Sequence, residues 1–310
     1  MATRTRLNIA VVGLGRMGLG IADRLAEAGH RVTAFDLSAE ARQAAALVGA
    51  DTVDSPEELP AATKTPRILW LMVPAGPVVD KVLFDGPGAL APRLQRGDIV
   101  IDGGNSNFRD SMRRSARLRE ERGLSMLDCG TSGGIEGQDI GYCLMVGGER
   151  GAYASCEPAF AAIAMKRGYA HVGPSGAGHF VKMVHNAMEY GFLQVLGEGF
   201  AMLGASEFPL DLPRLAELWT HGSVIRSWLM ELVAEALARP DHFEKIAPAV
   251  GGGSTGTWAV EEARRTGVKL PAIELSLKER TDKPSNEYAA RMVAALRYEF
   301  GRHPFTTRGG

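Results

Sequence analysis

The chain has 310 residues, of which 45% are hydrophobic and 23% charged, as in an ordinary globular protein with room for two domains. Its 35 basic and 36 acidic residues give a formal net charge of -1, which favours neither nucleic acid nor an anionic membrane as a partner. Three cysteines without a C-x-x-C pair argue against disulfides and zinc, and an N-terminal apolar run interrupted by glycines argues against a signal peptide, so we expect a cytoplasmic protein.

The first half of the chain alternates β-branched runs with helical patterns. This alternation predicts βαβ units and a mostly parallel sheet. Strands are predicted at residues 7–12, 31–36, 68–73, 98–102, 126–129 and 142–146. Helices are predicted at 17–28 and 107–122, and two more follow the N-cap candidates Ser38 and Ser55.

The pattern changes near residue 174, beyond which only helical periodicity is evident. The predicted helices span residues 177–203, 212–221, 225–238, 258–266, 271–281 and 287–300. We therefore expect an N-terminal Rossmann-type dinucleotide-binding domain at 1–174. An all-helical substrate and dimerisation domain with a C-terminal tail would follow at 175–310.

A G-x-G-x-x-G motif follows the first strand and opens the first helix, the context that indicates a dinucleotide site. Asp36 ends the second strand, where a carboxylate accepts both ribose hydroxyls of NAD and repels a 2′-phosphate. No arginine directly follows Asp36, so NAD is favoured over NADP; the alternative is that Asp36 pairs or caps locally. The predicted cofactor-binding residues are Gly13, Leu14, Gly15, Arg16, Met17, Gly18, Asp36, Val73, Pro74 and Asn105.

Two further loops follow predicted strands. Residues 102–107 contain Asn105, and residues 130–134 contain Ser132, Gly133 and Gly134, whose backbone amides suit a carboxylate. Each alone is more often a simple turn. Because open α/β sheets bind ligands at the carboxyl edge of their strands, the joint position of the loops points to a site.

The segment 178–190 places four polar side chains on one face of a helix. Lys182, His185, Asn186 and Glu189 have the spacing i, i+3, i+4 and i+7. The residues between them are mostly apolar, so we expect a largely buried helix. Unpaired buried charge is costly, and the cluster therefore indicates a site.

These motifs together resemble the 6-phosphogluconate dehydrogenase family, and Lys-x-x-His-Asn is the most specific of them. The resemblance implies that Lys182 is the general base and Glu189 the general acid of an NAD-dependent oxidative decarboxylation in the pentose phosphate pathway. Ser132, Gly133, Gly134, His185 and Asn186 would hold the substrate carboxylate and hydroxyls, and Asn105 would lie between nicotinamide and sugar. No metal is expected.

The C-terminal region adds to the resemblance. Arg297 and His303 match a segment that reaches the active site of a neighbouring subunit, which implies a homo-oligomer. Tyr190, Thr255 and Arg280 match further substrate contacts. Gly253 stands where many members have a lysine, and the chain resembles the short, NAD-linked branch with one helical unit.

Two other functions remain open. One is a β-hydroxyacid dehydrogenase acting on a small substrate without phosphate, such as 3-hydroxyisobutyrate, which the missing lysine at position 253 keeps open. The other is a non-catalytic NAD-binding protein, which the fold alone would permit.

Overall fold

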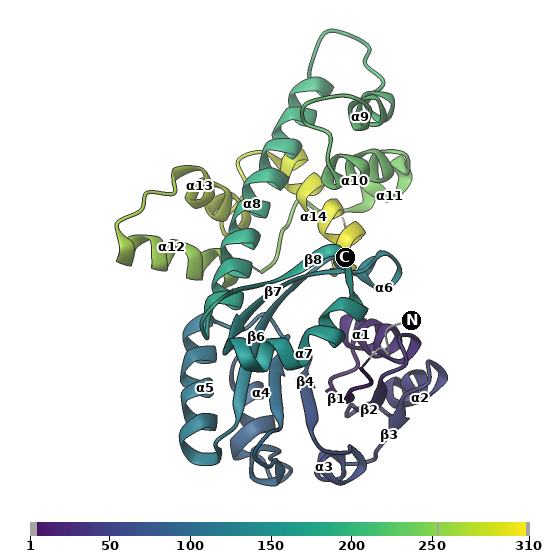
Figure 1. Cartoon of the computed structure of the whole chain (residues 1–310). Coiled ribbons are helices and arrows are strands. Elements are labelled where there is room, and N and C mark those ends of the chain that lie inside the picture. The colour runs from purple at the N-terminus through teal and green to yellow at the C-terminus, as the bar shows by residue number, and fades with distance from the viewer. Residues whose placement is uncertain (1–4, 253, 308–310) are drawn as a thin grey trace. The chain divides into compact units, whose positions relative to one another are not determined.

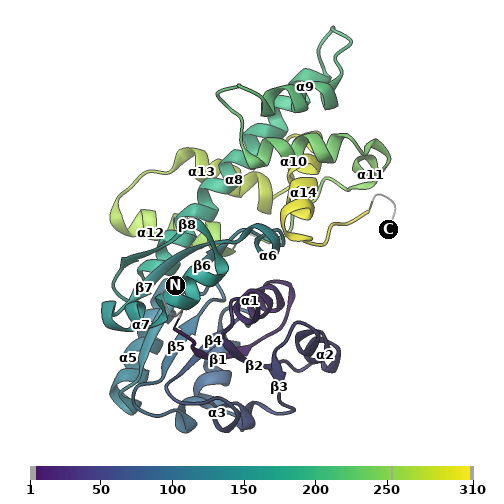
Figure 2. The same ribbon diagram turned by 45° about the vertical axis from the view of Figure 1, so that its right-hand side comes forward.

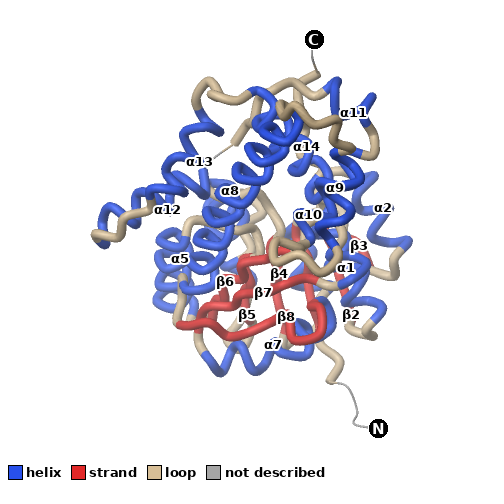
Figure 3. The backbone as a smooth tube through the Cα atoms, turned by 90° about the horizontal axis from the view of Figure 1, so that it is seen from above, coloured by secondary structure: helices blue, strands red, loops and turns tan. Residues whose placement is uncertain are grey.

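The computed structural model describes residues 5–252 and 254–307. The chain forms two compact units, Met1–Lys182 (unit 1) and Met183–Gly310 (unit 2). The named strands all belong to unit 1, as the red segments of Figure 3 show. Within the described residues, no helix has the length and apolar character needed to cross a membrane.

Unit 1 is built on one sheet of eight strands in the order β3-β2-β1-β4-β5-β6-β7-β8. The strands from β3 to β6 in this order are parallel, and β7 runs antiparallel to β6. The order changes direction at β1, which lies between β2 and β4. The strands are β1 (Asn8–Val12), β2 (Arg31–Phe35), β3 (Asp51–Thr52), β4 (Arg67–Leu71), β5 (Ile99–Asp102), β6 (Ser125–Ser132), β7 (Tyr142–Gly148) and β8 (Ala164–Gly173).

Side chains that alternate along β1 enter two different cores. Ile9 and Val11 pack in one cluster with residues of α1 and α7, whereas Ala10 and Val12 pack in another with residues of α4 and α5. Helices therefore cover both faces of the sheet (Figure 1). The helices are α1 (Arg16–Glu27), α2 (Ala39–Leu47), α3 (Leu59–Ala62), α4 (Pro77–Asp80), α5 (Phe108–Arg122), α6 (Gly137–Ile140) and α7 (Arg150–Ile163), with short turns η1 (Pro56–Glu58), η2 (Lys81–Asp85) and η3 (Ala91–Arg93).

Unit 2 consists of helices packed around one core. Leu193 and Phe200 of the long helix α8 join Met230 and Val233 of α10 and residues 292–296 of α14. In Figures 1 and 2, α12 and α13 lie on one side of α8, and α10, α11 and α14 on the other. The helices are α8 (Ala177–Gly204), which begins in unit 1, then α9 (Leu212–Thr220), α10 (Trp228–Leu237), α11 (Pro240–Lys245), α12 (Ser254–Thr266), α13 (Pro271–Thr281) and α14 (Glu287–Gly301).

The predicted fold class, a Rossmann-type domain followed by helices, is confirmed, and each predicted strand is present within a few residues. Strands β3 and β8 and helices α4, α6, α7 and α11 were not predicted. β8 is an edge strand whose side chains are mostly exposed or half-buried, and Arg167 interrupts it with a φ of 65°. Ser38 caps α2 by accepting the N–H of Ala41, whereas the Ser55 hydroxyl donates to Glu58 instead.

Helix α8 is buried on one face, whereas we expected a largely buried helix. Lys182, Ala187 and Leu193 are buried, but Met188, Phe192 and Val195 are more than half exposed. The periodicity of α8 is apolar on two faces, and this chain covers only one of them. The division between the two units falls eight residues after the predicted boundary because the first turns of α8 pack on the sheet of unit 1.

Candidate active site

The turn after β1 has the shape of a dinucleotide-binding loop. Gly13 has a φ of 93°, and a Cβ there would lie 2.6 Å from the carbonyl oxygen of Met72. A Cβ on Gly18 would collide with the Gly13 carbonyl, so α1 packs closely on the turn. Gly15 and Arg16 are exposed at the start of α1, and a Cβ on Gly15 would meet nothing within 4 Å. The exposed N-terminus of α1 therefore fits the pyrophosphate of NAD.

Asp36 lies at the end of β2, as predicted, and its carboxylate closes the glycine-rich turn. Oδ2 accepts the N–H of Leu14 at 2.6 Å, and Oδ1 accepts the N–H of Ser38 at 2.9 Å. Asp36 therefore does bond to neighbouring backbone groups, which was the alternative to ribose binding. These bonds do not exclude ribose binding, because each carboxylate oxygen has a further lone pair. The predicted role of Asp36 stays compatible with its geometry.

The change in strand order at β1 and β4 marks the ligand-binding edge of the sheet. Val73 and Pro74 follow β4 there, and a Cβ on Gly104 would lie 2.5 Å from the Val73 carbonyl oxygen. Asn105, with a φ of 54°, donates to the Thr131 carbonyl at 3.1 Å and accepts the Thr131 N–H at 2.9 Å. The structure thus brings the two predicted loops together.

A buried arginine that the sequence did not single out supports this edge. Arg114 of α5 is 0% exposed, and its guanidinium bonds both carboxylate oxygens of Asp80, at 2.7 and 3.2 Å. It also donates to the Gly76 carbonyl and lies 3.7 Å from the carboxylate of Asp102. Ser106 donates to the same Asp102 carboxylate. Arg114 therefore ties the loop after β4 to the loop after β5.

The start of α8 is fastened to β6 by a second buried charge. Asp128, 1% exposed, accepts the N–H groups of Gly176 at 2.7 Å and His179 at 2.9 Å. This carboxylate caps the helix and faces the positive end of its dipole. A Cβ on Gly130 would lie only 2.5 Å from the Cβ of Lys182. Because residue 130 is glycine, the buried Lys182 approaches the end of β6.

The loop after β6 presents the small residues predicted to hold a carboxylate. Ser132 ends β6, and Gly133 and Gly134 follow with φ values of 124° and 57°. Ser132 pairs across the antiparallel ladder with Cys143 of β7. The last three residues of β6 therefore include Ser132, and Gly130 among them lies against Lys182 of α8.

The predicted polar row on α8 continues into unit 2. His185, Asn186 and Glu189 are half-buried, and His185 Nδ1 lies 3.0 Å from Asn186 Oδ1. Lys182 and Glu189 are seven residues apart on one unbroken helix, which is nearly two turns. Helix α8 therefore carries both an amine and a carboxylate on one face.

Two guanidinium groups gather around Tyr190 in unit 2. The guanidinium carbon of Arg280 lies 3.9 Å from the Tyr190 ring centroid, and Arg297 Nη1 donates to the Gly251 carbonyl at 2.7 Å. A Cβ on Gly252 would lie 3.5 Å from Arg297 Nη2 and 3.9 Å from Arg280 Nη2. Predicted phosphate ligands from three helices are thus neighbours.

Burial and mutual repulsion both disfavour the charged forms of these arginines. Burial lowers the pKa of Arg280, and burial followed by the positive charge of Arg280 lowers the pKa of Arg297 to about 10. Glu189 acts in the opposite direction on both groups. Arg280 Nε is buried and has no hydrogen-bond partner among the described residues. An anion bound here would relieve the repulsion, so the cluster fits a phosphate.

The remaining predicted residues of unit 2 lie near its chain ends and loops. Thr255 is half-buried in the first turn of α12, and the half-buried His303 lies 5.9 Å from Phe300 between ring centroids. Gly253, which stands where many family members have a lysine, lies outside the described residues.

The tail after α14 docks on its own unit (Figure 2). Ala247 N–H donates to the Thr306 carbonyl at 2.8 Å, and Phe305 packs against His242 and Tyr298. Arg297 also lies beside Arg280 of the same chain. The paired guanidiniums therefore form without a second subunit.

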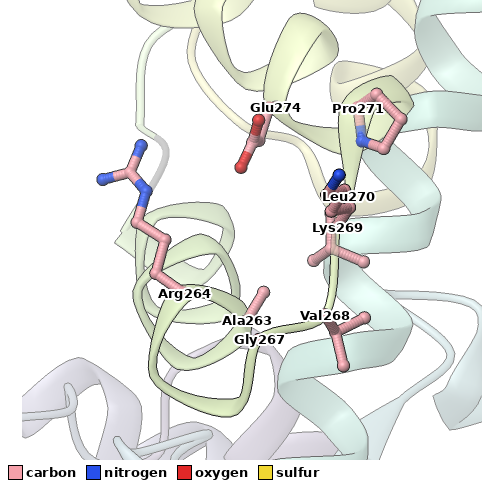
Figure 4. Close-up of a pocket in the computed structure, with 8 residues that line it drawn as sticks. All are labelled: Ala263, Arg264, Gly267, Val268, Lys269, Leu270, Pro271 and Glu274. Atoms are coloured by element: carbon pink, nitrogen blue, oxygen red, sulfur yellow. The ribbon is translucent and has the colours of Figure 1, made fainter.

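A separate pocket of about 340 Å³ lies in the turn that joins α12 to α13 (Figure 4). Arg264, Lys269 and Glu274 line it together with small and apolar residues. It contains none of the predicted site residues, so we do not assign the chemistry to it. No cluster of three or more histidine, cysteine or acidic side chains suited to a metal occurs among the described residues.

Family models cover nearly the whole chain. The NAD-binding domain of 6-phosphogluconate dehydrogenase matches residues 8–173, and the C-terminal domain of the same enzyme matches residues 178–303. The chain belongs to the 6-phosphogluconate dehydrogenase family. It is an oxidoreductase with an NAD-binding domain, as predicted.

Two further comparisons place the chain within this family. It is 46% identical to an NAD(+)-dependent, decarboxylating 6-phosphogluconate dehydrogenase of Haloferax volcanii, over 96% of this chain and 98% of that protein. It also resembles the solved 6-phosphogluconate dehydrogenase of Plasmodium falciparum, with 26% identity and a TM-score of 0.78, covering 94% of this chain but 63% of that one. The chain therefore matches a relative of its own length and is shorter than the Plasmodium falciparum enzyme.

The fold is shared more widely than the family. A 3-hydroxyisobutyrate dehydrogenase of Salmonella typhimurium has a TM-score of 0.73 at 21% identity, covering 92% of this chain and 99% of that one. At this identity the likeness concerns the fold alone. The site residues must therefore distinguish a phosphorylated from a non-phosphorylated substrate.

Proposed function

We propose that the chain catalyses the NAD-dependent oxidative decarboxylation of 6-phospho-D-gluconate to D-ribulose 5-phosphate and CO2. The observation that carries the proposal is the pair Arg280 and Arg297 beside Tyr190. Tyr190 directly follows Glu189, whose charge acts on both arginines. Two half-buried guanidiniums suit a phosphate dianion, which carries more charge and more acceptor oxygens than the single carboxylate of a small hydroxy acid. The similarity to the Haloferax volcanii enzyme supports the same substrate.

In this proposal Lys182 moves the proton of the substrate's 3-hydroxyl. Bound NAD supplies the acceptor for the hydride that leaves C3. Lys182, in its neutral form, takes the hydroxyl proton in that oxidation, which yields a β-keto acid. It then returns the proton to the C3 oxygen as the C1–C2 bond breaks and CO2 leaves. This role needs a neutral amine in the substrate complex, and the Lys182 side chain is buried.

Glu189 completes the reaction by donating a proton to the carbon that becomes C1 of the product. Its place seven residues after Lys182 on α8 gives base and acid the same rigid support. We assign Ser132, Gly133 and Gly134, together with His185 and Asn186, to the substrate carboxylate and hydroxyls. Asn105, fixed by its two bonds to Thr131, is assigned to the position between nicotinamide and sugar.

We assign the phosphate to Tyr190, Thr255, Arg280 and Arg297. The family lysine is replaced by Gly253, so guanidiniums and loop amides must hold the phosphate without it. The clear rival is a β-hydroxyacid dehydrogenase that acts on 3-hydroxyisobutyrate. The pair of half-buried arginines argues against it, because a substrate without phosphate gives this pair no dianion to bind.

The test compares NADH formation and CO2 release from 6-phosphogluconate, gluconate and 3-hydroxyisobutyrate. We expect kcat/KM to be at least about 100-fold higher for 6-phosphogluconate than for gluconate, since two charged hydrogen-bonding groups are used only by the phosphate. CO2 and NADH should form in equal amounts. A higher kcat/KM for 3-hydroxyisobutyrate would overturn the proposal in favour of the rival.

We further propose that the chain is a homo-oligomer. Val184, Met188, Phe192, Val195 and Met202 form an exposed apolar row at helical spacing on α8, and Met202 is 79% exposed. Exposed rows of this kind mark interfaces, and a second copy of α8 would present the same row. The resemblance adds that the tail completes the neighbouring active site.

A mixing experiment distinguishes two arrangements of the C-terminal segment: one in which Arg297 enters the active site of a neighbouring subunit, and one in which it stays in the site of its own chain. Lys182→Ala and Arg297→Ala chains are each expected to be inactive. If Arg297 acts on a neighbouring subunit, unfolding and refolding the two together restores about a quarter of wild-type activity, because half of the dimers are mixed and each has one intact site. Absence of any recovery would show that Arg297 serves its own chain, as in the single chain described here.

A further inference from the structure

An arginine that lies six residues after Asp36 in the sequence contacts the turn after β2. Arg42 of α2 folds back so that its Nη1 donates to the carbonyl oxygens of Asp36 at 2.9 Å and Leu37 at 3.4 Å. Its Nη2 lies 3.3 Å from the carboxylate of Asp54. An arginine therefore lies in the turn after Asp36, although none directly follows Asp36 in the sequence.

The same turn contains a second carboxylate beside Asp36. The hydroxyl of Ser38 donates to Glu40 Oε2 at 2.7 Å and accepts the N–H of Ala41 at 3.1 Å. A serine hydroxyl has one proton, so Glu40 takes the only one that Ser38 can give. This bond, together with the Glu40 backbone, lowers the pKa of Glu40, so its carboxylate is ionised at neutral pH.

Four donor groups around this turn suit a phosphate, and each already has an acceptor within the chain. The N–H groups of Leu14 and Ser38 donate to Asp36, the Ser38 hydroxyl donates to Glu40, and Arg42 donates to carbonyl oxygens. A 2′-phosphate binds through such N–H, O–H and guanidinium groups. Carboxylates therefore hold three of these donors, whereas Arg42 is held by main-chain carbonyl oxygens and by Asp54.

We propose that Glu40 is a second residue that determines the preference for NAD, and that Arg42 is the cation that a 2′-phosphate engages once the carboxylates are removed. Asp36 accepts the ribose hydroxyls and repels the phosphate directly. Glu40 adds like charge and holds the Ser38 hydroxyl away from a phosphate. The inference rests on the assignment of NAD as the cofactor, but not on the identity of the sugar substrate.

The test measures binding of NADH and NADPH by the quenching of tryptophan fluorescence, without any sugar substrate. The variants are Asp36→Ala, Glu40→Ala, the double variant, and the double variant with Arg42→Ala. Glu157→Ala serves as the control, because it removes an exposed carboxylate of unit 1 on helix α7. It corrects for the change in net charge.

We expect Glu40→Ala to keep NADH affinity within about twofold and to raise NADPH affinity about five- to tenfold. The double variant should gain more NADPH affinity than Asp36→Ala alone, and Arg42→Ala should abolish that gain. Unchanged NADPH affinity on removing Glu40 in both backgrounds, or a gain equal to that of Glu157→Ala, would overturn the proposal. A wild-type chain that binds NADPH as tightly as NADH would overturn the cofactor assignment itself, whereas inactivity on 6-phosphogluconate would affect only the proposed reaction.

Discussion

The carboxylate of Asp128 accepts the backbone N–H of His179 at 2.9 Å and so fixes the first turn of α8 to the middle of β6. Lys182 lies one turn further along the same helix. The position of the proposed base therefore depends on a buried charge that itself takes no part in the chemistry.

Replacing Asp128 with asparagine tests this dependence. The amide keeps one acceptor but turns an NH2 group toward a backbone N–H, so we expect the unfolding free energy to fall by about 1–2 kcal/mol. We also expect kcat to fall at least about tenfold, because Lys182 moves. Asp98→Asn is the matched control, since Asp98 is also buried and also accepts backbone N–H groups, those of Arg67 and Gln95. If both variants lose stability and kcat alike, Asp128 has no positioning role.

Arg297 allows a prediction in which stability and substrate binding separate. Arg297→Gln removes a half-buried charge that Arg280 repels, so the unfolding free energy of the free protein should change by less than about 1 kcal/mol. KM for 6-phosphogluconate should rise about 10- to 100-fold, whereas KM for NAD should not change. Lys278→Gln, which removes an exposed charge from the same helix as Arg280, should leave both constants unchanged. An unaltered KM for the sugar would remove Arg297 from the phosphate site.

Glu189→Gln tests the proposed acid. The variant keeps the shape of the side chain but cannot donate a carboxylic proton, so formation of ribulose 5-phosphate should slow about 100- to 10,000-fold. Binding of NADH, measured by fluorescence, should stay unchanged. Glu198→Gln on the exposed part of α8 is the control for charge. Product formation at the wild-type rate in Glu189→Gln would show that another group protonates C1.

The Asp80–Arg114 pair predicts a pH dependence of stability. Burial alone would raise the pKa of Asp80, but hydrogen bonds from Arg114 and Arg113 lower it to about 2. A depressed carboxyl pKa stabilises the folded state above the unfolded value of about 3.9, and this contribution is lost as the pH falls toward 2.

Urea unfolding of Asp80→Asn at several pH values measures that contribution. At pH 7 the variant should be less stable than the wild type by roughly 2 kcal/mol or more. The difference should shrink by about that amount between pH 4 and pH 2. Asp51→Asn, at an exposed position of β3, should show no such trend. A constant difference across this range would mean that the carboxylate charge contributes nothing.

The sequence predicted the parts of the molecule that depend on local patterns. Buried strands followed by glycine turns located Gly13, Asp36 and Asn105 at the ends of β1, β2 and β5. Arg42 and Arg114 were missed because neither adjoins a motif, and each acts on groups distant in sequence or turned back along the chain.

The exposed face of α8 shows a different limit. Its periodicity is apolar around most of the helix, which predicts burial, yet Met188 and Phe192 are exposed. Whether an apolar row is covered by the same chain or by another copy is decided by packing partners, which local sequence does not specify. The interface proposed on α8 and the prediction of a buried helix share Val184 and Met188.

The most direct test of the mechanism is the rate of NADH formation from 6-phosphogluconate by Lys182→Ala, with Lys166→Ala as the control at an exposed position of β8. Lys182→Ala should bind NADH like the wild type and lose roughly a thousandfold in kcat, because no other group takes the 3-hydroxyl proton. Lys166→Ala should keep full activity. Turnover by Lys182→Ala at a rate near that of the wild type would contradict the assignment of Lys182 as the base.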